Sequence, residues 1–544
     1  MKNVDKNKLK YIALANTVIL FAYAFAVSGI YYETNDDATL SNILNGAFGG
    51  NGYELIYVNI WLSRFMKILQ DIFTGSNMVV VVQLVFVFLS IWRIITLIME
   101  KYNAVQGLIM ANILFLPFAT ELISKFQYVK TSTVIIIAGL MLIAVNLAKT
   151  NIRLFTGYLL IVVGCGIRFD SFLAAGALSA FTLLYYFFRL DSNGKMAAIK
   201  KMVVLFVIVF GLEGVNRVYY STNPAWKDFT EYNRARTKLS DYKENYIPLY
   251  FDNVVAQGFS ENDVQLMYNG NYFDNTYFTT DVIYRAADAV GNKPVKNIIA
   301  DYLHIVINLF HPLNEKIYKL GFILCLLLFV FSDKKSKLYQ FGTLAMFALL
   351  ILYLMTVNRF MSRIEAMLII ALAINCVMCF DTGVIGKFQL IKIVHITMAV
   401  IILLCMPVQL RYRQGKYNAY LATGHKYENI VLEMSSSKEN LYLFDSSQTD
   451  YFAGYDVFSP RPAGFFSNIC PTGSWYSNSI YSNSVLDAYN MESPLIDSVN
   501  NPNVFISNER LDIKLKYVQE HYDQAVYAVK VTDNGICDYQ FRKD

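Results

Sequence analysis

The sequence predicts a polytopic α-helical membrane protein with a small α/β domain at its C-terminal end. Hydrophobic residues make up 55% of the 544 residues, well above the usual share in a soluble domain. They gather in blocks of about 17 to 22 residues, the length that crosses a hydrocarbon core of roughly 30 Å. From residue 411 onward the chain becomes polar, and short strand-like and helix-like patterns alternate.

About eleven hydrophobic segments are expected to be transmembrane helices. They are 11–31, 77–98, 104–122, 131–148, 154–168, 171–188, 202–220, 317–332, 338–357, 364–381 and 393–410. Lysines and arginines mark alternate connections, as the positive-inside rule requires of cytoplasmic loops. Because four lysines lie in the first ten residues, we expect the N-terminus in the cytoplasm, and an odd number of spans then places the C-terminus outside.

The topology leaves three long segments on the outer face. In the first, 32–76, apolar residues recur at helical spacing on either side of a glycine-rich stretch, which predicts two helices along the membrane surface. The alternative is a twelfth span over 54–73. The second segment is the loop 221–316, and the third is the tail. We therefore expect a membrane domain over 1–410 and an extracytoplasmic domain over 411–544.

The tail has the patterns of one small α/β domain. Residues 440–444, 504–507 and 525–531 read as strands, and 511–522 reads as a helix. Cys470 and Cys537 lie in this region. An extracytoplasmic position permits a disulfide between them, and the sequence leaves open whether they pair or stay free.

An acidic run follows the first hydrophobic segment directly. It contains Glu33, Asp36 and Asp37, with Asn35 before the pair of aspartates. On the outer face a carboxylate here is placed to act as a general base, with Asp36 the first candidate, Asp37 the second and Glu33 the third. The alternative is capping, since Asn and Asp favour the first positions of a helix, and one residue can cap while another catalyses.

Several arginines are predicted on the same face, where the positive-inside rule disfavours them. A guanidinium group binds phosphate oxygens bidentately and stays charged, so we interpret the set as a phosphate site. The alternative is that they contact lipid headgroups or pair with acids such as Asp170 and Glu365. The candidates are Arg168, Arg234, Arg236, Arg359 and Arg363.

One carboxylate and several cations suffice for one kind of glycosyl transfer. The carboxylate takes the proton from a sugar hydroxyl as that oxygen attacks an anomeric carbon. If the leaving group is already a phosphate, no general acid is needed, because cations stabilise the departing oxygen. The predicted chemistry is inverting transfer from a lipid phosphate.

The arrangement resembles the GT-C superfamily of integral membrane glycosyltransferases. The stretch Asn35-Asp36-Asp37-Ala38-Thr39-Leu40 is similar to their Asp-Glu type motif in the first outer loop. The resemblance implies a polyprenyl-phosphate sugar donor, Asp36 as the catalytic residue with Asp37 beside it, and Arg359 and Arg363 on the carrier phosphate. This sequence has Asp at the second motif position instead of Glu, and the subfamily, sugar and acceptor stay unassigned.

The expected partners are the polyprenyl-linked donor, a bacterial cell-envelope glycan or other acceptor, and membrane lipid. The modest net charge of +5 is explained by inner-loop lysines, so nucleic-acid binding is not expected. The carboxylates would suit Mg²⁺ or Mn²⁺, although no second acidic cluster is dedicated to an ion. Two other functions stay open: a transporter or flippase for a lipid-linked saccharide, and a non-catalytic assembly protein that binds through its tail.

Overall fold

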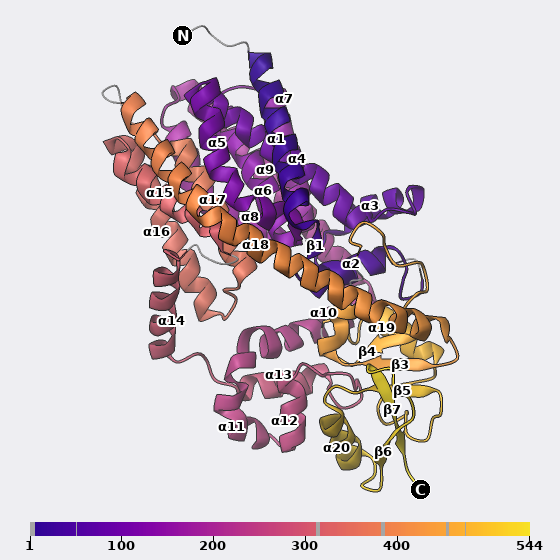
Figure 1. The fold of residues 1–544 in the computed structure, drawn as a ribbon. Helices are drawn as coiled ribbons and strands as arrows, with labels where there is room; N and C mark the ends of the chain where they lie inside the picture. The colour runs from indigo at the N-terminus through magenta and orange to yellow at the C-terminus, as the bar shows by residue number, and fades with distance from the viewer. Residues whose placement is uncertain (1–5, 51, 312–315, 382–386, 453–455, 474) are drawn as a thin grey trace.

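Long apolar helices form one end of the molecule, and a polar part built around a five-stranded sheet forms the other (Figure 1). The computed structural model describes residues 6–50, 52–311, 316–381, 387–452, 456–473 and 475–544. The N-terminus lies at the far end of the bundle from the sheet (Figure 1).

Eight helices of the described chain are long and apolar enough to cross a membrane. They are α1 (Lys6–Ser28), α4 (Met78–Tyr102), α5 (Ala104–Ala119, continued by η1, Thr120–Ser124), α6 (Tyr128–Val145), α8 (Phe169–Phe187), α16 (Lys334–Thr356), α17 (Ser362–Cys379) and α18 (Lys387–Ser436). Two further apolar helices, α7 (Ile152–Ile167) and α15 (Leu320–Phe331), are shorter, and α9 (Ser192–Thr222) is longer but more polar. A helix therefore occupies each predicted segment, and the chain is a polytopic helical membrane protein.

Helix α6 lies at the centre of the bundle, with its side chains buried from Tyr128 to Ala144. It packs closely on α7 where two glycines face each other. A Cβ on Gly139 would lie 2.6 Å from the carbonyl oxygen of Gly157. Small residues allow such close backbone approach, which is the usual basis of helix packing in membranes.

The first outer segment contains the two expected helices, α2 (Asn35–Leu44) and α3 (Ile60–Ile72). At 1.5 Å per residue, the 13 residues of α3 extend about 20 Å, which is too short for a hydrocarbon core of roughly 30 Å. Helix α3 is not among the described helices that are long and apolar enough to cross a membrane, but α7 and α15 are also short, so the choice between a surface helix and a twelfth span over 54–73 stays a prediction. Phe65, Ile68 and Ile72 are exposed on α3, and their placement on a membrane surface stays a prediction.

The sheet has the strand order β4-β3-β5-β7-β6. Strands β3, β4 and β5 are parallel, and β7 pairs antiparallel with both β5 and β6. The strands are β3 (Leu441–Phe444), β4 (Ile469–Pro471), β5 (Val504–Ser507), β6 (Tyr527–Lys530) and β7 (Cys537–Arg542), with helices α19 (Ile480–Ala488) and α20 (Leu511–His521) between them. The three strands and the helix predicted for the tail are all present.

The second outer loop packs on the sheet domain. Buried side chains from 232–290 and from 441–541 form one hydrophobic cluster. We call residues 224–290 and 437–544 together the polar body. Its remaining elements are α10 (Pro224–Arg236), η2 (Thr237–Asp241), η3 (Glu244–Tyr250), α11 (Phe251–Val255), α12 (Glu261–Tyr268), α13 (Thr280–Ala289) and η5 (Ser446–Phe452). The chain returns to the bundle through α14 (Val295–Asn308) and η4 (Ile317–Lys319).

Helix α18 connects the bundle to the polar body (Figure 1). It runs without interruption for 50 residues, through the boundary expected between 410 and 411, and ends at Ser436. The first strand of the sheet begins shortly after it, at Leu441.

The two cysteines of the tail are both free thiols in the described chain. Cys470 is on β4 and Cys537 is on β7, with β3 and β5 between these strands. The two strands are not neighbours in the sheet, and the Sγ of Cys537 lies 3.7 Å from the carbonyl oxygen of Leu443 on β3.

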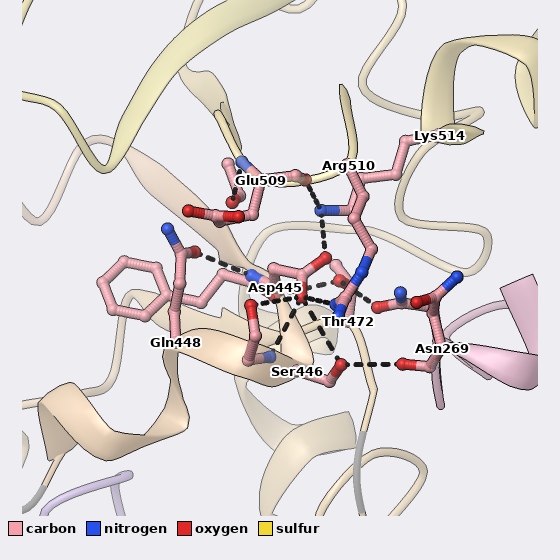
Figure 2. A network of polar contacts seen from close by, with 12 residues as sticks. Asn269, Asp445, Ser446, Gln448, Thr472, Glu509, Arg510 and Lys514 are labelled. Atoms are coloured by element: carbon pink, nitrogen blue, oxygen red, sulfur yellow. Dashed lines mark hydrogen bonds and ion pairs between the residues drawn. The ribbon is translucent and has the colours of Figure 1, made fainter. Parts of the chain in front are cut away.

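A buried polar network holds the polar body together at the carboxyl end of β3 (Figure 2). Asp445 is fully buried and forms ion pairs with Lys514, at 2.7 Å, and with Arg510, both from the region of α20. The neighbouring Ser446 hydroxyl donates to the carbonyl oxygen of Asn269, at 3.1 Å, just after α12. The network thus connects the sheet to the second outer loop.

Candidate active site

Asp36 lies in the first turn of α2 and is half-buried. Its Oδ1 accepts a hydrogen bond of 2.7 Å from the indole nitrogen Nε1 of Trp475, which is 439 residues away in the sequence. The tail and the first outer loop therefore meet at this carboxylate. The other oxygen, Oδ2, is free of the indole and can accept a proton.

Asp37 is fully buried, and both of its carboxylate oxygens accept hydrogen bonds from the protein. Its Oδ1 accepts from the backbone N–H of Tyr128, at 3.0 Å, and its Oδ2 accepts from the Thr34 hydroxyl, at 3.1 Å. The capping alternative is wrong for α2, whose N-cap residue is Thr34 and has no side-chain cap hydrogen bond. Asp37 instead accepts from a backbone N–H at the start of α6. Burial, and after it the nearby charge of Asp36, raise the pKa of Asp37 well above its usual value.

Glu33 belongs to a separate network of buried charges. Its carboxylate pairs with Lys125 at 2.9 Å and with Lys130 at 2.7 Å. Lys130 also pairs with Glu121 at 2.8 Å, and Arg413 of α18 forms an ion pair with the same glutamate. The short parallel pair of β1 (Tyr31–Tyr32) and β2 (Lys125–Phe126) brings these segments together. Because Glu33 is neutralised by two lysines, it is a poor base.

Three aromatic side chains surround Asp36. The ring of Tyr57 lies 5.2 Å from that of Trp475, edge to face, and 5.9 Å from that of Tyr128, stacked. The guanidinium of Arg168 lies over both tyrosines, 5.2 Å from the centre of Tyr57 and 5.9 Å from that of Tyr128. An arginine on the edge of an aromatic cluster keeps its charge and gains cation–π stabilisation.

The charges of the predicted base and of two predicted arginines all act on the hydroxyl group of Tyr57. Burial raises the pKa of Tyr57, the negative charge of Asp36 raises it further, and the positive charges of Arg236 and Arg168 oppose the rise. All three groups are therefore within electrostatic reach of this one hydroxyl.

Arg359 is joined to this group through Asp241. That carboxylate pairs with Arg236 at 3.3 Å and with Arg359 at 3.1 Å. One carboxylate between two guanidinium groups leaves a surplus of positive charge. Nothing in the sequence singles out Asp241, and no sequence signal links Tyr57 or Trp475 to Asp36.

The other two predicted arginines differ in their surroundings. Arg234 is exposed and lines a cavity of about 420 Å³ together with Arg217. Arg363 is half-buried at the start of α17, and the described residues form no ion pair with it. The suggested pairing of an arginine with Glu365 is wrong, because Glu365 pairs with Lys316 and Lys319.

The suggested pairing of Arg168 is confirmed. Its guanidinium lies 2.7 Å from the carboxylate of Asp170, which is largely exposed.

A metal ion at the acidic run receives no support from the described residues. The one described group whose ligand atoms lie close enough to share an ion consists of Asp263, Glu520 and His521. It lies on α12 and α20 in the polar body and includes neither Asp36 nor Asp37. His521 Nε2 and Asp263 already contact each other at 2.8 Å.

Comparison with known proteins gives similarity in structure but not in sequence. No family model and no curated protein matches this chain. Two solved structures of ArnT from Cupriavidus metallidurans are similar over 98% of this chain and 97% of theirs, at 9% identity. The TM-score is 0.42 for ArnT bound to undecaprenyl phosphate and 0.41 for the apo state. At these TM-scores the likeness says nothing about the function of this chain.

Proposed function

We propose that this chain is an inverting glycosyltransferase, which moves a sugar from a polyprenyl phosphate to a hydroxyl group of a cell-envelope acceptor. The observation that carries the proposal is the arrangement around Tyr57. A half-buried carboxylate, Asp36, held by an indole N–H, shares this tyrosine with Arg168 and Arg236. The reaction takes place on the side of the membrane where the polar body lies, which the charge pattern puts outside the cell.

The carboxylate of Asp36 and the guanidinium groups of the arginines have different roles in the reaction. Asp36 Oδ2 takes the proton from the acceptor hydroxyl, whose oxygen attacks the anomeric carbon of the donor. The bond between that carbon and the phosphate oxygen breaks, and its electron pair stays on the phosphate. The attack comes from the face opposite the leaving group, so the anomeric configuration is inverted.

The arginines stabilise the phosphate as it departs. Arg236 and Arg359 share one acid, Asp241, and Arg168 has only an exposed acid as its partner. The three arginines are thus paired with two carboxylates, which leaves one positive charge in excess. Fixed cations at the position where negative charge develops lower the barrier more than the same cations in water would.

The direct test uses the purified protein in lipid nanodiscs with a radiolabelled polyprenyl-phosphate sugar and a cell-envelope extract as acceptor. We expect release of polyprenyl phosphate and transfer of the label, with the opposite anomeric configuration in the product by NMR. Retention of configuration, or transport of the intact lipid-linked sugar across a vesicle membrane without a covalent product, would contradict the proposal.

The hydrogen bond from Trp475 gives a second prediction. Trp475→Phe keeps an aromatic ring but removes the N–H that orients Asp36. Hydrogen bonds to charged groups are worth about 1.5–3 kcal/mol, so we expect kcat to fall by roughly tenfold or more, with the KM for the donor little changed. Trp475→Ala also removes the ring, so both parameters should worsen. Steady-state kinetics of the two variants measure the difference, and unchanged kcat in Trp475→Phe would show that the indole does not position the base.

The role of Arg168 gives a third prediction. In Arg168→Gln the fork that binds phosphate oxygens is lost, and we expect the KM for the donor to rise by about tenfold. The control is Asp170→Asn, which removes the ion-pair partner of Arg168 but leaves its charge. If both variants have the same kinetic effect, Arg168 acts through its pair with Asp170 and not on the donor.

A further inference from the structure

A cavity of about 320 Å³ opens beside the acidic run, between the start of α2, helix α18 and η5. Its volume is at the lower end of the range for small-ligand sites, roughly 300–1,000 Å³. Thr34 and Asn35, which directly precede Asp36, are part of its wall. Asp450 of η5 also lines it. The cavity therefore adjoins the segment that carries the proposed base.

The wall combines aromatic rings with polar groups. Tyr32, Tyr420, Tyr427 and Tyr451 line the cavity, and the last two are stacked with their ring centres 4.1 Å apart. Hydroxyl and amide groups from Thr34, Asn35 and Thr423 lie between them. Such a surface suits a sugar ring, whose C–H face packs on aromatic rings while its hydroxyl groups take hydrogen bonds.

The charges of the wall are nearly balanced. Glu33 is neutralised by two lysines, and Glu428 is held by both terminal nitrogens of Arg461, at 2.6 and 2.7 Å. The remaining charged groups of the wall are Lys416 and Asp450, which have opposite signs. A wall of this kind gives no preference for an anion, in contrast to the arginines around Tyr57.

Asp450 also connects the cavity to the base. Desolvation by the surrounding protein, and after it the negative charge of Asp36, raise the pKa of Asp450. The two carboxylates are thus within electrostatic reach of each other. Asp36 does not itself line the cavity, whereas the two residues that precede it do, so a ligand there lies next to the segment of the base. A donor phosphate held by the arginines would lie near Tyr57.

We propose that this cavity is the acceptor subsite and that it takes a neutral saccharide unit. The inference rests on the proposed function and specifies its acceptor. The sugar packs on the tyrosines and presents one hydroxyl group to Asp36. An anionic headgroup is disfavoured as the occupant, because Lys416 is the one cation among the described residues that line the cavity, beside the carboxylates of Glu33, Glu428 and Asp450.

The test uses a substitution that places a bulky side chain in the cavity from an exposed position. Ala419 is exposed on α18 and lines the cavity, so Ala419→Trp obstructs it without disturbing a core. Ala422 is exposed on the same helix three residues further on and is not part of the lining, so Ala422→Trp is the matched control. Binding of cellotriose, maltotriose and chitotriose to the full-length protein in nanodiscs is measured by saturation-transfer NMR without donor. Binding of polyprenyl phosphate is measured in parallel.

We expect wild type and Ala422→Trp to bind at least one of these oligosaccharides, and Ala419→Trp to bind it at least tenfold more weakly, with polyprenyl phosphate binding unchanged. The subsite is overturned if wild type binds none of them, if the two tryptophan variants behave alike, or if Ala419→Trp loses polyprenyl phosphate instead. If wild type transfers no sugar but only Ala419→Trp loses the oligosaccharide, the proposed function fails and the saccharide site stands.

Discussion

The Asp36→Asn variant is expected to lose sugar transfer by about 10²- to 10⁴-fold, the usual contribution of a positioned general base. The amide keeps the shape of the side chain and can still accept the hydrogen bond from Trp475, so the fold around it is preserved. It cannot take a proton from the acceptor hydroxyl. The loss should therefore appear in kcat, with the KM for the donor nearly constant.

The matched control is the neighbouring residue. Asp37 is buried, its pKa is raised well above the usual value, and its oxygens accept from a backbone N–H and a hydroxyl group. An amide oxygen can still accept one of these bonds, so we expect Asp37→Asn to keep most of the activity and to lose a modest amount of stability.

Transfer assays on both variants, with thermal unfolding of each in detergent, separate the two roles. The assignment of the base is contradicted if Asp36→Asn transfers sugar at the wild-type rate. If Asp37→Asn unfolds normally but is the inactive variant, the base is Asp37 and the buried hydrogen bonds must open during catalysis.

The helices of the bundle could be predicted from the sequence because the signal is local. A run of apolar residues long enough to cross a membrane needs no partner to be recognised. The extent of α18 could not be predicted in the same way. Beyond residue 410 the helix is polar, its residues are mostly exposed or half-buried, and η5 of the polar body packs on it. Pro407 within the helix would ordinarily suggest an end.

Only those residues of the candidate site that belong to a local sequence pattern could be predicted. The sequence predicts a helix that begins at the acidic run, and α2 does begin at Asn35. The position of the arginines on the outer face stays a prediction. The residues that join the acidic run to the arginines could not be found, because Trp475, Tyr57 and Asp241 are ordinary residues until the tertiary fold places them side by side. The packing of the second outer loop on the tail is equally non-local.

The largest expected effect on stability is at Asp445, the centre of the network in Figure 2. In Asp445→Ala, Lys514 stays fully buried but loses its carboxylate. Removing one partner of a buried ion pair costs about 3–5 kcal/mol. We expect the polar body to unfold at a markedly lower temperature, measured by intrinsic fluorescence of the full-length protein in detergent. If the alanine variant does not fold, Asp445→Asn is measured in its place. It keeps an acceptor oxygen, so its unfolding temperature should fall by less.

The control for this change is an exposed pair of the same kind, Asp533 with Lys530. Exposed ion pairs contribute about 0–1 kcal/mol, so Asp533→Ala should leave the unfolding temperature almost unchanged. An equal effect of both substitutions would show that the network around Asp445 does not hold the polar body together.

The pH dependence gives an independent check on Asp445. Burial alone would raise its pKa, but the charge of Lys514 and the hydrogen bonds to the carboxylate hold that pKa below its usual value. A carboxyl group with a lowered pKa in the folded state stabilises the fold above its unfolded pKa of about 3.9, and this contribution is lost as the pH falls through the folded value. The difference in unfolding temperature between wild type and Asp445→Asn should therefore be constant near neutral pH and should shrink below about pH 4. A difference that persists in acid would mean that the substitution acts through packing and not through the charge of the carboxylate.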